Sequence, residues 1–255
     1  MKIPNIEKLY YSPVKSLSFC NTSRLVIIKD IGIKNDRIYA FTRLIKKSES
    51  IHYQDNPGKR KLNFFLTLKN SPFLNKYNFY LDHKYLYFYL SNQLINKILI
   101  NDKSEQQSFS VELMNREKLI KNIPYLIYNI QNPFFDSMPN NTISLININT
   151  IKDFEKKIGR KIQKERFRAN FYIKDIDPWD EFNLINKKIL INNSLFKVLK
   201  KIPRCSATNL VPNLDISDIN IPLTLKKIYG HINMGVYLVP LTDGVVEVGN
   251  KINVF

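Results

Sequence analysis

Cysteine is scarce in this sequence of 255 residues, where Cys20 and Cys205 are the only two and lie far apart. Two such residues cannot build a disulfide framework, and their separation fits neither a zinc site nor a redox pair. With three histidines in the chain, a metal site made of several histidines is not expected either. This scarcity favours a reducing compartment. The role of each cysteine must then be inferred from the residues around it.

Long apolar runs are also missing from the chain. No run approaches the length of about 18 residues that a membrane span needs. The first residues, MKIPNIEKLYYSP, lack the basic and then apolar segments of a secretory signal. We therefore expect no membrane span and a cytoplasmic protein. Hydrophobic residues still make up 44% of the chain and aromatic residues 12%, so that the chain can bury a sizeable core and disorder is not expected.

Acidic residues are too few to balance the basic ones, 22 against 39, which gives a formal net charge of +17. Such a balance raises nucleic acid or an anionic surface as a partner. The densest basic clusters, at residues 59–61, 160–168 and 197–204, are however short and separated, whereas nucleic-acid binders concentrate their cations in a stripe. We expect no nucleic-acid partner, although a basic β-barrel that binds nucleic acid stays an alternative. An anionic small ligand stays open.

Short segments rich in β-branched or aromatic residues alternate with Asn, Asp, Gly and Pro along most of the chain. Their spacing predicts a mostly β protein of the α+β class, with an antiparallel barrel or sandwich rather than βαβ units. The first strands are expected at residues 7–11, 24–28, 37–42, 63–68, 78–81 and 85–90. Two hairpins are predicted, one from residues 188–191 and 195–199 and one from residues 237–241 and 245–248.

Two helices are predicted in the second half of the chain. Thr150 can cap a helix over residues 151–158, with Asp153 three residues on as in a capping box and Gly159 at its end. A second helix is expected over residues 219–229. The polar, weakly patterned stretch 92–122 marks a boundary. We therefore predict an N-terminal β-barrel-like domain at residues 1–120 and a second β-barrel domain with a few helices at residues 121–255.

Cys205 follows Lys200, Lys201 and Arg204 and precedes small and hydroxylated residues. A thiol among cations loses its proton more readily, and the thiolate is the form that attacks electrophiles or binds soft metals. The alternative interpretation is a small buried hydrophobe, because free cysteine is often buried. Catalysis by a nucleophilic cysteine would need one of the three histidines as its base, and no cysteine-hydrolase signature surrounds Cys205.

Four further stretches combine turn residues with cations or hydroxyls, namely residues 11–16, 32–37, 166–170 and 229–237. Taken singly, Lys15, Arg37, Arg166 and Arg168 could be solvated surface charges, because isolated surface pairs are common and weak. His231, in the last stretch, could be an ordinary hydrogen-bonded loop histidine. The order of the stretches along the chain carries more information than any one of them.

In that order, the stretches resemble the MOSC proteins, the family of the molybdenum cofactor sulfurase C-terminal domain, here with the N-terminal β-barrel domain that often precedes it. The resemblance rests on Tyr11-Ser12-Pro13-Val14-Lys15-Ser16, Gly32 with Asp36-Arg37, Phe135-Asp136, Arg166-Phe167-Arg168-Ala169-Asn170, Arg204-Cys205 with Ala207-Thr208-Asn209, Tyr229-Gly230-His231, Gly235-Val236-Tyr237 and Val248-Gly249-Asn250. It covers nearly the whole chain and weakens between Lys69 and Asn122. Family members usually have proline where Ala169 stands, a change that is not expected to touch the cofactor. They also often have a second acidic-Trp element after Trp179 where Phe182-Asn183-Leu184 stands here, and this difference leaves the outer pocket and the substrate undefined.

The resemblance implies that Cys205 is the catalytic residue and that its thiolate is a direct ligand of molybdenum. The molybdenum cofactor would also hold the metal through the dithiolene of a phosphorylated pyranopterin. A thiolate suits such a sulfur-rich centre, and cations with backbone N–H groups suit the phosphate. The residues implied to contact the cofactor are Lys15, Ser16, Arg37, Thr150, Arg166, Asn170 and Arg204.

Similarity to the amidoxime-reducing members of the family implies an enzyme, a molybdenum-dependent oxidoreductase that removes oxygen from N-hydroxylated small-molecule substrates. The chain has no four-cysteine cluster, so that electrons are expected from a separate ferredoxin-, flavodoxin- or cytochrome-like partner. The alternative from another class is a carrier that delivers the cofactor or its sulfur without turnover. Pyridoxal phosphate binding is a further label attached to the family.

Overall fold

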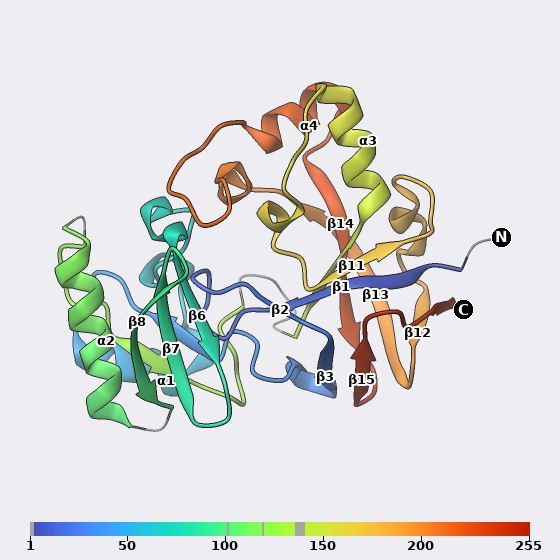
Figure 1. The fold of residues 1–255 in the computed structure, drawn as a ribbon. Helices are drawn as coiled ribbons and strands as arrows, with labels where there is room; N and C mark the ends of the chain where they lie inside the picture. The colour runs from blue at the N-terminus through green and yellow to red at the C-terminus, as the bar shows by residue number, and fades with distance from the viewer. Residues whose placement is uncertain (1–2, 101, 119, 136–140) are drawn as a thin grey trace.

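Strands dominate the structure, a computed structural model that describes residues 3–100, 102–118, 120–135 and 141–255 (Figure 1). The largest sheet has eight strands and curls into a half-barrel. In spatial order its strands are β16 (Ile252–Val254), β12 (Lys188–Ile191), β13 (Ser194–Pro203), β14 (Asn233–Pro240), β10 (Ile143–Asn147), β11 (Phe171–Lys174), β1 (Asn5–Tyr11) and β2 (Cys20–Thr22). The predicted class, mostly β with a few helices, is confirmed.

Three smaller sheets and four α-helices account for the other regular elements of the described residues, apart from short 3-10 turns. The sheets consist of β15 (Gly244–Glu247), β3 (Arg24–Ile28) and β4 (Gly32–Ile33); of β6 (Tyr77–Leu81), β7 (Tyr85–Leu90) and β8 (Gln93–Leu99); and of β5 (Tyr39–Phe41) and β9 (Leu126–Tyr128). The helices are α1 (Lys47–Asp55), α2 (Lys103–Arg116), α3 (Ile148–Ile158) and α4 (Ile221–Tyr229). Within the described part of the chain, no helix is long and apolar enough to cross a membrane.

The first strands of the chain belong to sheets of the C-terminal half. β1 pairs with β11 and with β2 in the eight-stranded sheet, and β3 pairs with β15. Figure 1 accordingly shows both chain ends on one side of the molecule, where Asn5 forms a bridge with Lys251. Strands from before residue 120 thus share sheets with strands from after it, so that the sheets do not separate at this residue. The two predicted domains and the N-terminal barrel stay predictions.

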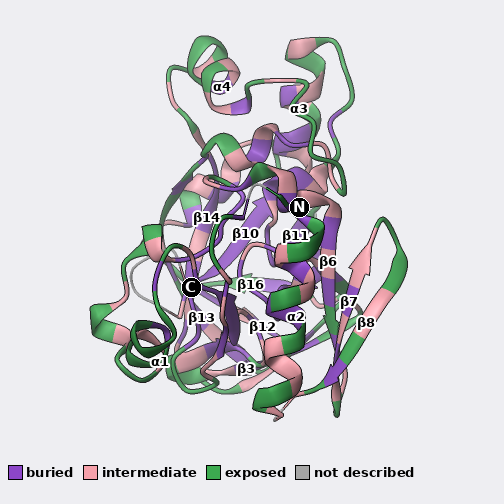
Figure 2. Cartoon of the chain, turned by 90° about the vertical axis from the view of Figure 1, so that its left-hand side faces the viewer, coloured by how far each residue is buried: buried purple, intermediate pink, exposed green. Residues whose placement is uncertain are grey.

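Alternating burial along β13 shows how the large sheet carries its core. Phe196 and Val198 are buried while Lys197 between them is exposed, because successive side chains of a strand point to opposite faces. Figure 2 shows buried residues concentrated in the central strands and exposed residues on the outer faces of the helices. A second core lies among β6, β7 and α2 and contains the aromatic residues Phe79, Phe88 and Phe109.

One of the two predicted hairpins is confirmed and the other is wrong. β12 and β13 pair antiparallel on either side of Asn192-Asn193, as predicted. β14 and β15 do not pair, because β14 lies in the eight-stranded sheet and β15 pairs with β3. The carboxylate of Asp243 accepts a hydrogen bond from the backbone N of Lys29 at 2.7 Å, which ties this turn to the end of β3. β10 and β11 also pair in parallel, against the predicted antiparallel arrangement.

The segment at residues 63–68 was predicted as a strand and is mostly irregular. It begins in the 3-10 turn Leu62–Phe64 and makes a single bridge between Phe65 and Thr42. Its end is bent by Asn70, whose side chain accepts a hydrogen bond from the backbone N of Thr67 at 2.9 Å. Asparagine competes with a sheet ladder in this way. The other strands predicted in the first half of the chain are confirmed.

Both predicted helices exist, but the first has a different cap. Helix α3 begins at Ile148, and the side chain of Asn147 accepts a hydrogen bond from the backbone N of Asn149 at 2.9 Å. Thr150 therefore lies inside the helix and does not cap it. Helix α3 ends at Gly159 in a left-handed conformation, as predicted. The stretch 92–122 is more regular than its pattern indicated, since it contains β8 and α2.

Candidate functional site

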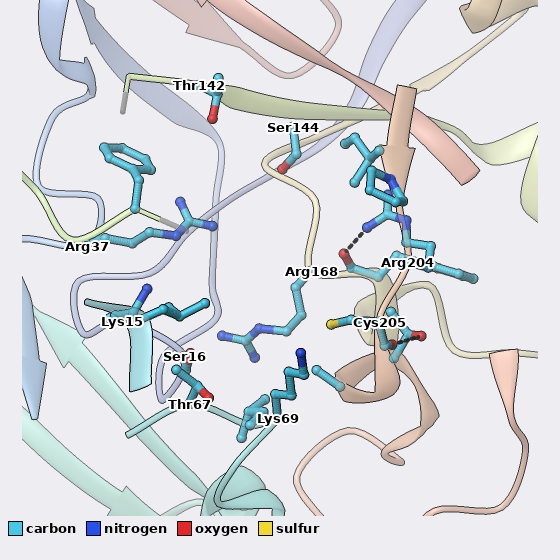
Figure 3. Close-up of a pocket in the computed structure, with 18 of the residues that line it drawn as sticks. Lys15, Ser16, Arg37, Thr67, Lys69, Thr142, Ser144, Arg168, Arg204 and Cys205 are labelled. Atoms are coloured by element: carbon cyan, nitrogen blue, oxygen red, sulfur yellow. Dashed lines mark hydrogen bonds between the residues drawn. The ribbon is translucent and has the colours of Figure 1, made fainter. Parts of the chain in front are cut away.

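A cavity of about 690 Å³ lies between the N-terminal half of the chain and the large sheet. Figure 3 shows Lys15, Ser16 and Arg37 on one side of it and Arg204 and Cys205 on the other. Its described lining contains no aspartate or glutamate, whereas its cationic side chains are Lys15, Arg37, Lys69, Arg166, Arg168 and Arg204. Such a lining attracts an anionic ligand. All of the predicted site residues except Thr150 line this cavity.

Cys205 lies where β13 ends and a short 3-10 helix, Ser206–Asn209, begins. The backbone is fixed on both sides of it. Arg204 N donates to Ile232 O at 2.9 Å, and Cys205 O accepts hydrogen bonds from the backbone N of Thr208 at 3.1 Å and from its hydroxyl at 2.8 Å. The side chain of Cys205 is exposed, and Figure 3 shows its sulfur directed into the cavity. The interpretation of Cys205 as a small buried residue is therefore wrong.

Arg204, the residue before Cys205, has a guanidinium that main-chain carbonyls hold in place. Its Nε donates to Met234 O at 2.9 Å and its Nη1 to Phe167 O at 3.0 Å, and burial lowers the pKa of the guanidinium. Gly235, at φ 78°, makes room for it, because a Cβ there would lie 2.4 Å from Leu145 O and 3.3 Å from Nη2 of Arg204. The glycine of the Gly235-Val236-Tyr237 motif thus leaves the space that the side chain of Arg204 occupies.

Arg166 carries a donor without an acceptor. Its Nη1 lies 2.7 Å from a carboxylate oxygen of Asp218 and donates to Asn209 O at 2.8 Å, while Nε donates to Gln163 at 2.8 Å. Among the described residues, Nη2 has no hydrogen-bond partner although it is buried. Buried polar atoms are almost always paired, so this donor is an exception that the oxygen of a bound ligand could satisfy. This observation fits an anionic group such as a phosphate.

Lys15 and Arg37 form the opposite wall. Lys15 is buried, and its amine donates to Phe134 O at 3.1 Å. Burial, together with the charges of Arg37 and Arg60, holds the pKa of Lys15 well below its usual range. Arg37 donates to the buried carboxylate of Asp36, which lies behind the cavity wall. An anion in the cavity would relieve the repulsion between Lys15 and its cationic neighbours.

Three residues of the lining have a left-handed backbone. These are Ser16 at φ 63°, Arg37 at φ 56° and Arg168 at φ 50°. A residue with a Cβ pays about 1–2 kcal/mol for this conformation, and such residues cluster at functional sites. The turns that carry these side chains are thus held in place by the surrounding fold, and no feature of the sequence marks the conformation.

Asn170 lines the cavity, but its side-chain amide forms hydrogen bonds with other residues of the protein. Its oxygen accepts hydrogen bonds from Ser144 N at 3.1 Å and from the Ser144 hydroxyl at 2.8 Å, and its nitrogen donates to Tyr10 O at 3.2 Å. Asn170 therefore fixes β1 and β10 around β11. Its predicted contact with the cofactor stays a prediction.

Thr150 is the predicted site residue that does not reach the cavity. It is buried, and its hydroxyl accepts a hydrogen bond from Trp179 N at 2.8 Å and donates to Glu181 at 2.7 Å. These bonds connect helix α3 to the 3-10 helix Asp180–Leu184. The structure gives Thr150 a role in packing, and its predicted phosphate contact has no support from this position.

Two cations of the lining were not among the predicted site residues. Arg168 lies within the stretch that supplied Arg166, and its guanidinium donates to Ser18 O. Lys69 comes from the segment where the family resemblance weakens, directly after the stretch that was predicted as a strand and is mostly irregular. The alternation of Arg166, Phe167 and Arg168 was a usable signal for the first, whereas no pattern in the sequence marks the second.

No group of three or more His, Cys, Asp or Glu among the described residues could hold a metal ion. Any metal bound at Cys205 would thus take its other ligands from elsewhere, as a cofactor would provide. Phe135 lines the cavity, with Arg37 above its ring at 5.4 Å. Asp136, which follows it in the predicted motif, lies outside the described residues.

Comparisons with known proteins agree with part of the resemblance. Residues 135–253 match the family model of the MOSC domain. No curated protein matches the chain. The YuaD protein from Bacillus subtilis has a similar structure with 13% identity and a TM-score of 0.47, covering 100% of this chain and 97% of that one. YiiM from Geobacillus stearothermophilus has 18% identity and a TM-score of 0.36, covering 44% of this chain and 53% of that one. The N-terminal barrel and the similarity to amidoxime-reducing members stay predictions.

Proposed function

We propose that the cavity binds the molybdenum cofactor and that Cys205 is the protein ligand of its metal. The MOSC domain, which residues 135–253 match, is associated with binding of this cofactor. The observation that carries the proposal is an exposed thiol directed into a cavity whose described lining is cationic and holds no carboxylate. A thiolate suits a soft, sulfur-rich metal centre, and the cations suit the phosphate of the pterin.

The side chains around the cavity divide this work. Arg166, with its orphan Nη2, and Lys15, Ser16 and Arg37 on the opposite wall would hold the anionic parts of the cofactor. Arg204, whose guanidinium is fixed by main-chain carbonyls, would add its positive charge to those that stabilise the anionic cofactor. When bound, the cofactor supplies a two-electron reduction that removes oxygen from an N-hydroxylated or related N-oxygenated small molecule. The electrons would come from a separate ferredoxin-, flavodoxin- or cytochrome-like protein.

Expression in a host that makes the cofactor tests this proposal. We expect the purified protein to contain molybdenum and pterin in equal amounts, measured by elemental analysis and by the fluorescence of the oxidised pterin. With a chemical reductant, the loaded protein should convert benzamidoxime to benzamidine. Protein without molybdenum and pterin would contradict the binding proposal.

The alternatives give different results in the same preparation. Cofactor that is retained without reduction of any hydroxylamine or amidoxime would favour a carrier that delivers the cofactor or its sulfur. Oligonucleotide binding that weakens steeply with salt, in protein that holds neither pterin nor molybdenum, would favour the basic nucleic-acid-binding alternative.

A further inference from the structure

The exposed part of the cavity lining differs in chemistry from its buried part. The cations Lys15 and Arg166 are each 2% exposed, and Arg204 is also buried. Leu62, at 48% exposed, and Lys69 lie at the solvent side of the same lining. The exposed lining therefore offers an apolar side chain and an amine in the same cavity as the exposed Cys205, whereas Lys15, Arg166 and Arg204 are buried. The buried cations suit a resident cofactor, and the exposed side chains suit a substrate that comes and goes.

Lys69 is available for such a substrate. Within the described part of the chain its amine has no hydrogen-bond or ion-pair partner, whereas Arg37 pairs with Asp36 and Arg166 pairs with Asp218. The backbone that carries it is well fixed, because the side chain of Asn70 donates to Phe65 O at 2.9 Å and accepts from the segment's own backbone. Figure 3 shows the Lys69 side chain extending toward the space beside Cys205 and Arg168.

We propose that Lys69 determines substrate specificity by binding a carboxylate on the substrate. This inference rests on the proposed function and adds a substrate class to it: an N-hydroxylated compound with an apolar body and an anionic group. Leu62 supplies apolar surface for the body, and Lys69 supplies the charge for the anionic end. An exposed pair of this kind changes affinity by up to about fivefold, enough to rank one substrate above another.

The test compares benzamidoxime with its 4-carboxy derivative, which carries the same reducible group and adds the charge. The variants are Lys69→Gln and Lys69→Arg, with Lys59→Gln as the control, since Lys59 is exposed and does not line the cavity. Dissociation constants are measured by calorimetry on the proteins as purified, without reductant, and kcat and KM with a chemical reductant. We expect wild type to prefer the carboxylate compound. Lys69→Gln should weaken its binding and raise its KM about fivefold, with little change for benzamidoxime and with rescue by Lys69→Arg.

Three results would overturn this proposal. Equal effects of Lys69→Gln on both compounds, or no effect on either, would show that Lys69 does not recognise the carboxylate. Loss of molybdenum and pterin from Lys69→Gln would assign Lys69 to the cofactor instead. If the calorimetry shows the preference and neither compound is reduced, the role of Lys69 stands and the enzymatic part of the proposed function fails. The two failures are therefore distinguishable.

Discussion

The two cysteines of this chain occupy opposite environments. Cys20 begins β2 and is buried, and its thiol donates to Phe79 O at 3.1 Å. Burial raises the pKa of this thiol to about 12, so that it stays protonated near neutral pH. Cys205 follows the end of β13 and is exposed in a cavity among cations. The chemistry of each thiol therefore depends on where the fold places it, more than on the abundance of lysine along the chain.

The largest expected difference between the two cysteines is in their rates of alkylation. At pH 8 a thiol with a pKa of about 12 is ionised in about 1 in 10⁴ molecules, and burial also blocks access of the reagent. We expect iodoacetamide to modify Cys205 at least about 100-fold faster than Cys20 in protein without cofactor, measured by mass spectrometry of the two peptides. Bound cofactor should protect Cys205. Similar rates for the two residues would contradict the comparison.

The next largest effect is expected from substitution of Gly235, the glycine beside Arg204. Gly235→Ala would place a Cβ 2.4 Å from Leu145 O at a positive φ. The free energy of unfolding should fall by about 3 kcal/mol, and the cofactor content should fall because Arg204 would move. Gly230→Ala is the matched control, since its φ is 76° and nothing lies within 4 Å of its Cβ. There we expect a loss of about 1 kcal/mol. Equal losses in urea unfolding would show that the close approach at Gly235 has no cost.

Replacing each cysteine by alanine should have small and different effects on stability. Cys20→Ala removes a buried sulfur and its hydrogen bond to Phe79 O, and should lower the free energy of unfolding by about 1.5 kcal/mol. Cys205→Ala changes an exposed side chain and should leave the stability of the cofactor-free protein within about 0.5 kcal/mol of wild type. Urea denaturation of both variants checks this. The reverse ranking would mean that Cys205 is a structural residue.

The strand that ends before Cys205 and the cationic stretches of the site could be recognised from the sequence because their patterns are local. β13 follows from alternating residues after Asn192-Asn193, and its end brings Arg204 and Cys205 to the cavity. The cationic stretches around Lys15, Arg37 and Arg166 also reach that cavity. That these stretches meet in one cavity depends on packing between distant segments, and the family resemblance rather than any local pattern predicted it.

The remaining features depend on contacts between distant segments. β15 pairs with β3 across more than two hundred residues, so the adjacent strands that predicted a hairpin were misleading. Thr150 forms hydrogen bonds with Trp179 and Glu181, which lie 29 and 31 residues further along the chain. Lys69 reaches the cavity because Asn70 bends a segment that has the composition of a strand. Propensity is a weak guide where tertiary contacts of this kind override it.

Cys205, and not Cys20, is the proposed ligand of the metal. Wild type, Cys205→Ala and Cys20→Ala should be expressed in a host that makes the molybdenum cofactor, with circular dichroism to show that all three fold. Loss of a metal ligand should lower the molybdenum content at least about tenfold. We therefore predict equal molybdenum per chain in wild type and Cys20→Ala, and less than about a tenth of that in Cys205→Ala, by elemental analysis. Equal molybdenum in wild type and Cys205→Ala would contradict the account.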